Sequence, residues 1–148
     1  MYSTILIPLD GSKRAEAILP HVEDLAGRYG ATLVLMQVVD PVPLSIGYEP
    51  SYIALREDWE QRTKEAESYL AGLQGEFREK AIPARTCVVS GPVVDAIIKA
   101  AEREGADLIA LASHGRTGLS QVFYGSVAAG VLHRIDRPLL LIRSRDGG

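Results

Sequence analysis

The chain has 148 residues, a length typical of one domain, so we predict a single domain over residues 1–148. Apolar residues make up 47% of it and charged residues 24%, which is the usage of a globular protein that can bury a core without disulfides or metals. The net charge of −3 gives no general positive field to attract nucleic acid, so any anion must be bound by local geometry.

Cysteine content and apolar patterning bear on the compartment. The single cysteine, Cys87, excludes an internal disulfide, and its apolar neighbours predict a buried position in a strand. No apolar run approaches the roughly 20 residues that span a bilayer. The first residues lack the basic and apolar regions of a signal peptide, so we expect a cytoplasmic protein that does not contact a membrane.

The first elements are two strands separated by a helix. Residues 2–9 and 31–39 are apolar without alternation, which is typical of strands covered on both faces. Between them, residues 12–29 place apolar side chains on one face of a helix. Pro20 falls inside that pattern and has no backbone N–H, so it predicts a kink or a restart there.

A long irregular stretch and a long helix follow. Residues 40–54 are rich in proline, and a loop of that length is either a functional flap near a ligand or a disordered segment; both interpretations stay open. Residues 55–79 predict the second helix. We expect its inward face to consist of Leu55, Trp59, Ala66, Tyr69, Leu70, Leu73 and Phe77.

The second half of the chain continues the alternation of strands and helices. Strands are predicted over residues 84–89, 107–112 and 138–143. A third helix opens with proline in residues 92–105, and a fourth covers residues 126–134. Alternation over the whole chain predicts an α/β fold with an open parallel five-stranded sheet and helices on both faces.

Ligands of open parallel sheets bind outside the carboxyl ends of the strands, where the strand order reverses. Three segments follow such strand ends, at residues 8–12, 37–40 and 112–126. The third carries Gly115, Gly118 and Gly125, whose backbone N–H groups can approach an anion closely. It also enters the fourth helix, where unpaired N–H groups favour phosphate. The spacing alone leaves phosphate binding and simple turns both open.

Three motifs that follow one another along the chain form a recognisable pattern. The segment ILIPLDGS covers residues 5–12, ASHGRTGL with YGSV covers residues 112–127, and DRPLLLI covers residues 136–142. In these motifs the chain resembles the universal stress protein family nearly end to end. The resemblance implies the strand order 3-2-1-4-5 of a Rossmann-like, adenine nucleotide alpha hydrolase-like fold.

The nucleotide-binding branch of that family carries a phosphate pattern of Gly, two residues, Gly, nine residues, Gly, then Ser or Thr. Gly115, Gly125 and Ser126 fit this pattern, while Ala112 stands in place of the first glycine. The resemblance therefore implies ATP, or ADP or AMP, as the ligand, with Mg²⁺ held by the nucleotide's own phosphates. Ala112 lies where the family's backbone passes the ribose.

The resemblance also implies roles for single residues. Asp10 would accept hydrogen bonds from a ribose hydroxyl, although a carboxylate before Gly11 equally suits a plain turn. Val38 and its neighbours would meet adenine through backbone groups. The nucleotide-binding residues expected on this basis are Pro8, Asp10, Ser12, Val38, Ala112, His114, Gly115, Arg116, Gly118, Gly125, Ser126 and Val127.

The sequence excludes several other nucleotide and hydrolase classes. No Gly-x-Gly-x-x-Gly turn follows the first strand, and no P-loop or nucleophile elbow is present. His114 has no catalytic partner at a fixed spacing, and we assign no catalytic residue and no metal ligand. We therefore expect an ATP-binding stress-response regulator or sensor, with slow ATP hydrolysis at most. The alternative, which Ala112 favours, is a dimeric interaction module that binds no nucleotide.

In the implied strand order the fifth strand lies at an edge of the sheet. Its residues are apolar throughout, and a hydrophobic exposed edge is a hazard that native proteins cover. We therefore predict a symmetric homodimer through antiparallel pairing of this strand. The interface residues would be Leu139, Leu140, Leu141 and Ile142.

Overall fold

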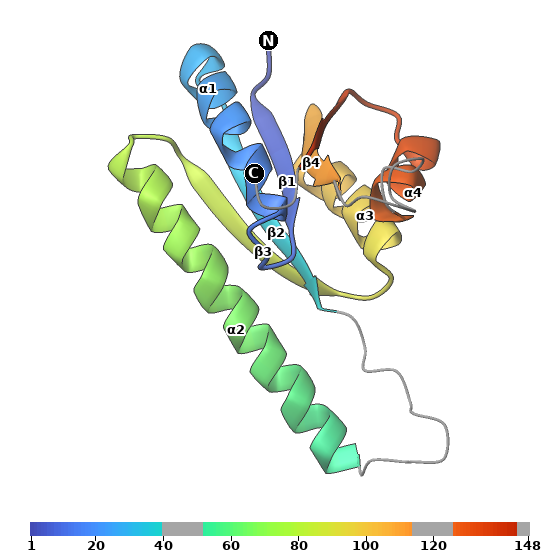
Figure 1. Cartoon of the computed structure of the whole chain (residues 1–148). Coiled ribbons are helices and arrows are strands. Elements are labelled where there is room, and N and C mark those ends of the chain that lie inside the picture. The colour runs from blue at the N-terminus through green and yellow to red at the C-terminus, as the bar shows by residue number, and fades with distance from the viewer. Residues whose placement is uncertain (40–51, 114–125, 145–148) are drawn as a thin grey trace.

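The computed structural model describes residues 1–39, 52–113 and 126–144, and its described strands form one parallel sheet (Figure 1). The sheet has the order β3-β2-β1-β4-β5, with every neighbouring pair parallel, so the predicted fold class and strand order are confirmed. The strands are β1 (Thr4–Leu9), β2 (Thr32–Val39), β3 (Ala84–Ser90), β4 (Leu108–Ser113) and β5 (Leu139–Arg143).

Helices cover both faces of this sheet. They are α1 (Leu19–Tyr29), α2 (Tyr52–Glu79), α3 (Val93–Glu104) and α4 (Ser126–Arg134), and a 3₁₀ segment η1 (Ala15–Ile18) precedes α1. One apolar cluster joins β1 and β2 to α1 and α2, and a second joins them to α3 and α4. Alternate side chains of β1 enter opposite clusters, since Ile5 and Ile7 belong to the first and Leu6 to the second. All three are completely buried, as unbroken apolar strands predict.

Within the described residues, every helix is too short or too polar to cross a membrane.

The helical pattern of residues 12–29 is divided in two, as Pro20 predicts. η1 ends at Ile18 and α1 starts at Leu19, which places Pro20 in the first turn of the new helix. A proline is well tolerated there, because the first N–H groups of a helix have no intrahelical partner. The helix ends at Gly30, whose φ of 67° is the left-handed conformation common after a helix.

α2 is longer than predicted and does not pack along its whole length. It begins at Tyr52, and its 28 residues span about 42 Å at 1.5 Å per residue. Figure 1 shows its first turns extending beyond the sheet. The prediction that Trp59 faces the core is therefore wrong: its side chain is 40% exposed, because no strand of the described sheet lies opposite that part of the helix. Buried positions begin further along, at Ala66 and Leu70.

The amino ends of β1 and β4 are joined by the side chain of Asp107. Its Oδ2 accepts hydrogen bonds from the Ser3 N–H (2.9 Å) and the Ser3 hydroxyl (2.8 Å), and its Oδ1 accepts from the Thr4 N–H (3.2 Å). A carboxylate that accepts several N–H and O–H groups stays ionised more easily. Asp107 thus fixes the start of the central strand against its neighbour.

The packing of α4 against α3 depends on Gly130. A Cβ at this position would lie 2.7 Å from Cγ2 of Val94, which is closer than real Cβ contacts allow. Because Val is branched at Cβ and has few rotamers, it cannot move aside cheaply. The close approach of the two helices therefore needs a residue without a side chain.

Replacing Asp107 by alanine should lower the free energy of unfolding by about 1–3 kcal/mol at neutral pH, because three donors lose their acceptor. Burial alone would raise the pKa of Asp107, but the hydrogen bonds from Ser3 and Thr4 outweigh it and hold the pKa below 3.8. A carboxylate with a lowered folded pKa stabilises the fold above its unfolded pKa, and that contribution is lost as the pH falls through the folded pKa. The difference in the free energy of unfolding between Asp107→Ala and the parent protein, measured by chemical denaturation, should therefore become smaller below about pH 3.8.

The matched control for this experiment is Asp24→Ala. Asp24 forms an exposed ion pair with Arg28 at 2.9 Å, and such surface pairs contribute roughly 0–1 kcal/mol. If Asp107→Ala lowers the free energy of unfolding no more than Asp24→Ala does, the role assigned to Asp107 is contradicted.

Replacing Gly130 by alanine should destabilise the fold by about 1–3 kcal/mol, because overpacking outweighs the better helix propensity of alanine. Gly72 in α2 is the control, since a Cβ there meets nothing within 4 Å. Gly72→Ala should stabilise the protein by about 0.5–1 kcal/mol. Thermal and urea unfolding of both variants measures the contrast, and the same sign of change in both would refute the packing argument.

Candidate functional site

The structure brings the described parts of the three predicted segments, residues 8–12, 37–39 and 112–113 with residue 126, together at the carboxyl edge of the sheet. β1 pairs with β2 on one side and with β4 on the other. The strands that follow β1 lie on one side of it and those that follow β4 lie on the other, so the strand order reverses between β1 and β4. The carboxyl ends of β1, β2 and β4 therefore meet at one edge, and the start of α4 lies beside them. This is the position at which open α/β sheets bind their ligands.

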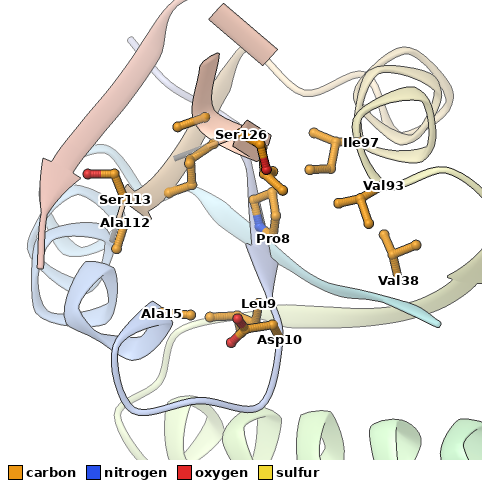
Figure 2. Close-up of a pocket in the computed structure, with 13 residues that line it drawn as sticks. Pro8, Leu9, Asp10, Ala15, Val38, Val93, Ile97, Ala112, Ser113 and Ser126 are labelled. Atoms are coloured by element: carbon orange, nitrogen blue, oxygen red, sulfur yellow. The ribbon is translucent and has the colours of Figure 1, made fainter. Parts of the chain in front are cut away.

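A pocket of about 280 Å³ occupies this position (Figure 2), near the lower end of the roughly 300–1,000 Å³ common for ligand pockets. Six of the predicted nucleotide-binding residues line it, namely Pro8, Asp10, Val38, Ala112, Ser126 and Val127. Leu9 and Ser113 also line it and lie within the predicted segments, whereas the sequence did not indicate the remaining lining residues, which are Ala15, Val93, Ile97, Leu111 and Ala128.

Asp10 follows directly on the last residue of β1 and is exposed. Its Oδ1 accepts hydrogen bonds from the Ser12 N–H (2.9 Å) and the Ser12 hydroxyl (2.6 Å). Ser12 Oγ in turn accepts a hydrogen bond at 3.1 Å from the N–H of Ala15, the first residue of η1. Within the described residues Oδ2 forms no hydrogen bond, so the turn uses one carboxylate oxygen and leaves the other for a ligand. Ser12 supports Asp10 and is not among the lining residues.

The opposite side of the pocket is formed by the beginning of α4. Ser126 is the first residue of this helix, and its side chain is exposed. The first N–H groups of a helix have no intrahelical partner and carry a partial positive charge. Figure 2 shows Ser126 across the pocket from Asp10, with Ala112 and Ser113 at the side. The partially positive start of α4 and the carboxylate of Asp10 thus lie at different parts of one pocket.

An apolar wall lies between these two polar regions. It consists of Val38 at the end of β2 and of Val93 and Ile97 on α3 (Figure 2). The periodicity of residues 92–105 predicts that these α3 side chains face inward, but it does not say which element they face. The pocket can therefore hold a ligand with an apolar surface, a hydroxyl-bearing part and an anionic part.

Several predicted site residues cannot be placed. His114, Gly115, Arg116, Gly118 and Gly125 lie outside the described residues and stay predictions. The same holds for the irregular stretch as far as residue 51, while residues 52–54 already belong to α2. Among the described residues, no group of three His, Cys, Asp or Glu side chains is arranged to hold a metal ion.

Comparison with known proteins gives matches over almost the whole chain. A model of the universal stress protein family matches residues 1–143. Universal stress protein MJ0577 from Methanocaldococcus jannaschii is 27% identical and covers 99% of this chain and 98% of its own length. A universal stress protein from Thermus aquaticus is 30% identical over 97% of this chain and all of its own length.

Solved structures agree with these matches. The structure of the hypothetical protein MJ0577 has a TM-score of 0.85 at 28% identity and covers 99% of both chains. Universal stress protein UspA from Lactobacillus plantarum has a TM-score of 0.80 at 24% identity, covering 96% of this chain and 98% of its own. A universal stress protein in complex with cAMP has a TM-score of 0.61 at 22% identity and covers 97% and 98% of the two chains.

Proposed function

The chain belongs to the universal stress protein family, and on that premise we propose that it binds an adenine nucleotide, foremost ATP, in the pocket between β1, β4 and α4. Its role would be that of a stress-response regulator or sensor in the cytoplasm, with slow ATP hydrolysis at most. In support, one solved universal stress protein of the same fold is described in complex with cAMP.

The observation that carries the proposal is the placement of Asp10 and Ser126 on different sides of one pocket with an apolar wall between them. Oδ2 of Asp10, which forms no hydrogen bond within the described residues, suits a ribose hydroxyl, which donates a hydrogen bond, and repels a phosphate. The N–H groups and the hydroxyl at the start of α4 suit phosphate oxygens. A nucleotide would therefore lie with its sugar at Asp10 and its phosphates at α4.

A magnesium ion would be held by the phosphates of this nucleotide. Asp10 is the only carboxylate among the described lining residues, and it stands on the sugar side. Mg²⁺ commonly takes most of its ligands from phosphates and water, so a single distant carboxylate is compatible with such binding.

A second candidate function is a dimeric interaction module that binds no nucleotide. Ala112 favours it, because this residue lines the pocket where the family's nucleotide-binding pattern has glycine. Nucleotide retained through purification separates the two functions. We expect denaturation of the purified protein to release an adenine nucleotide that mass spectrometry identifies, and protein free of nucleotide even after incubation with ATP would favour the interaction module.

We also propose that two copies pair through β5. In the described sheet β5 pairs only with β4, so its second edge is open. The side chains of Leu139 to Ile142 are half-buried and contribute to both apolar clusters. Antiparallel pairing of two β5 strands would satisfy the backbone groups of this edge and cover its side chains.

Asp10→Asn should weaken ATP binding about tenfold, because a hydrogen bond to a charged acceptor contributes roughly 1.5–3 kcal/mol. Asparagine keeps the acceptor that the turn needs, so the fold should be preserved. The sharper measurement compares ATP with 2′-deoxy-ATP and 3′-deoxy-ATP by titration calorimetry. The parent protein should discriminate against the deoxynucleotide that lacks the hydroxyl at Asp10, and Asp10→Asn should lose that discrimination.

The exposed Asp24 provides the control for this measurement. Asp24→Asn makes the same chemical change far from the pocket and should leave both affinities unchanged. If Asp10→Asn binds ATP as tightly as the parent and discriminates equally, the placement of the ribose at Asp10 is wrong.

Light scattering tests the predicted dimer. At micromolar concentration we expect a mass of about 32 kDa, twice the 16.0 kDa of one chain. A mass of one chain over that range would rule out stable pairing through β5.

A further inference from the structure

The described sheet ends in two edges, because β3 pairs only with β2 and β5 only with β4. A parallel strand directs the backbone groups of alternate residues toward its neighbour and those of the residues between them away from it. The Leu33 N–H of β2 donates to the Pro83 oxygen at 2.9 Å, so the backbone groups of the next residue, Ala84, point away from β2. The Ala84 oxygen therefore lies on the open edge of β3, where a strand of another molecule would pair.

A side chain of α2 already occupies this position on the β3 edge. Gln74 is half-buried, and its Nε2 donates a hydrogen bond to the Ala84 oxygen at 2.8 Å. A strand that paired with β3 at Ala84 would have to displace this amide and take over its acceptor. The Gln74 side chain therefore obstructs the amino-terminal half of the β3 edge.

Charged side chains stand along the same edge strand on the face that α3 covers. Arg85 pairs with Glu104 of α3 at 3.1 Å, and the guanidinium of Arg103 donates a hydrogen bond to Cys87 Sγ at 3.1 Å. Both arginine side chains are 51% exposed. Charged side chains on an edge strand oppose pairing, because an added strand would remove them from water.

The outer edge of β5 has neither feature among the described residues. The Pro138 oxygen accepts from β4 and the Ser144 N–H donates to β4, so the backbone groups of Leu139 and Leu141 between them point to the open edge. Within the described part of the chain, no side chain forms a hydrogen bond with these groups. The first charged residue of β5 is Arg143 at its end. The two edges of the sheet thus differ in how far they can accept another strand.

We propose that Gln74 and Arg85 close the β3 edge to strand pairing, so that copies of this chain associate through one edge of the sheet only. A chain with two open edges could add a copy at each and grow into a continuous sheet. With β3 closed, pairing through β5 ends at two copies, because both β5 edges are then used. The proposal concerns the opposite edge from the proposed β5 pair and is independent of nucleotide binding.

The test removes both obstacles from the β3 edge. Gln74→Leu removes the donor and keeps a good helix former in α2, and Arg85→Thr replaces the charge by a residue that is common in strands. The mass is measured by sedimentation velocity from micromolar to millimolar concentration. The parent protein should keep one mass over that range, and the double variant should form species larger than two chains.

A second background makes the test independent of β5. Leu141→Pro blocks the outer edge of β5, and it removes no hydrogen bond to β4 because the Leu141 N–H points outward. In this background the double variant should reach about twice the mass of Leu141→Pro alone, by pairing through β3. Growth that appears here but not in the parent background would support the closure of β3 and contradict pairing through β5.

The matched control makes the same two chemical changes on the exposed face of α2. Gln61→Leu with Arg56→Thr removes an amide that donates to Glu65 and an arginine that pairs with Glu60, and it should leave the mass unchanged. Circular dichroism and thermal unfolding establish that each variant is folded. If the double variant does not fold, Gln74→Leu and Arg85→Thr are measured singly, with a smaller increase in mass expected from each. Folded variants that keep the mass of Leu141→Pro in its background, or that gain no more than the control, overturn the proposal.

Discussion

The central position of β1 is the constraint on which the rest of the structure depends. This strand has a parallel neighbour on each side and helices on each face, so Ile5, Leu6 and Ile7 are completely buried. In a parallel sheet every carboxyl end points the same way, which brings Asp10, Val38 and Ala112 to one edge from distant parts of the chain. Asp107 fixes the opposite end of the same strand. The geometry of the pocket therefore depends on the most buried strand ends of the sheet.

In the proposed function, the turn after β1 would combine a structural and a binding role in the carboxylate of Asp10. Oδ1 of Asp10 holds Ser12, and Ser12 Oγ accepts from the Ala15 N–H, so the local structure already fixes the orientation of the Asp10 side chain. A ligand that bound this side chain would therefore lose little side-chain entropy. The two interpretations of Asp10 that the sequence leaves open, a turn residue and a ribose ligand, are thus compatible with each other. Tyr69 stabilises the same region from α2 through Glu16.

Much of the fold could be predicted from the sequence because its strands are apolar runs and its helix boundaries carry specific residues. Pro20 indicated the start of α1, and α4 covers the predicted residues 126–134. Trp59 shows the limit of such patterns: helical periodicity identifies the apolar face of α2, but not how far the sheet beneath it extends. The apolar wall from α3 could likewise not be predicted from the sequence, because it depends on how separate elements pack.

The placement of Ala112 bears on the departure from the family's glycine. Side chains of β4 alternate between the two faces of the sheet, and Ala112 packs against the apolar cluster of α1 and α2, as Ala15 does. Leu111 and Ala128 belong to the cluster on the other face, from which α4 approaches. The methyl group of Ala112 therefore lies on the η1 side of the pocket, next to the proposed sugar position, and away from the start of α4. In the proposed binding mode, a change from glycine to alanine at this position should consequently disturb the ribose contacts more than the phosphate contacts. That order follows from the strand's alternation and does not depend on the identity of the nucleotide.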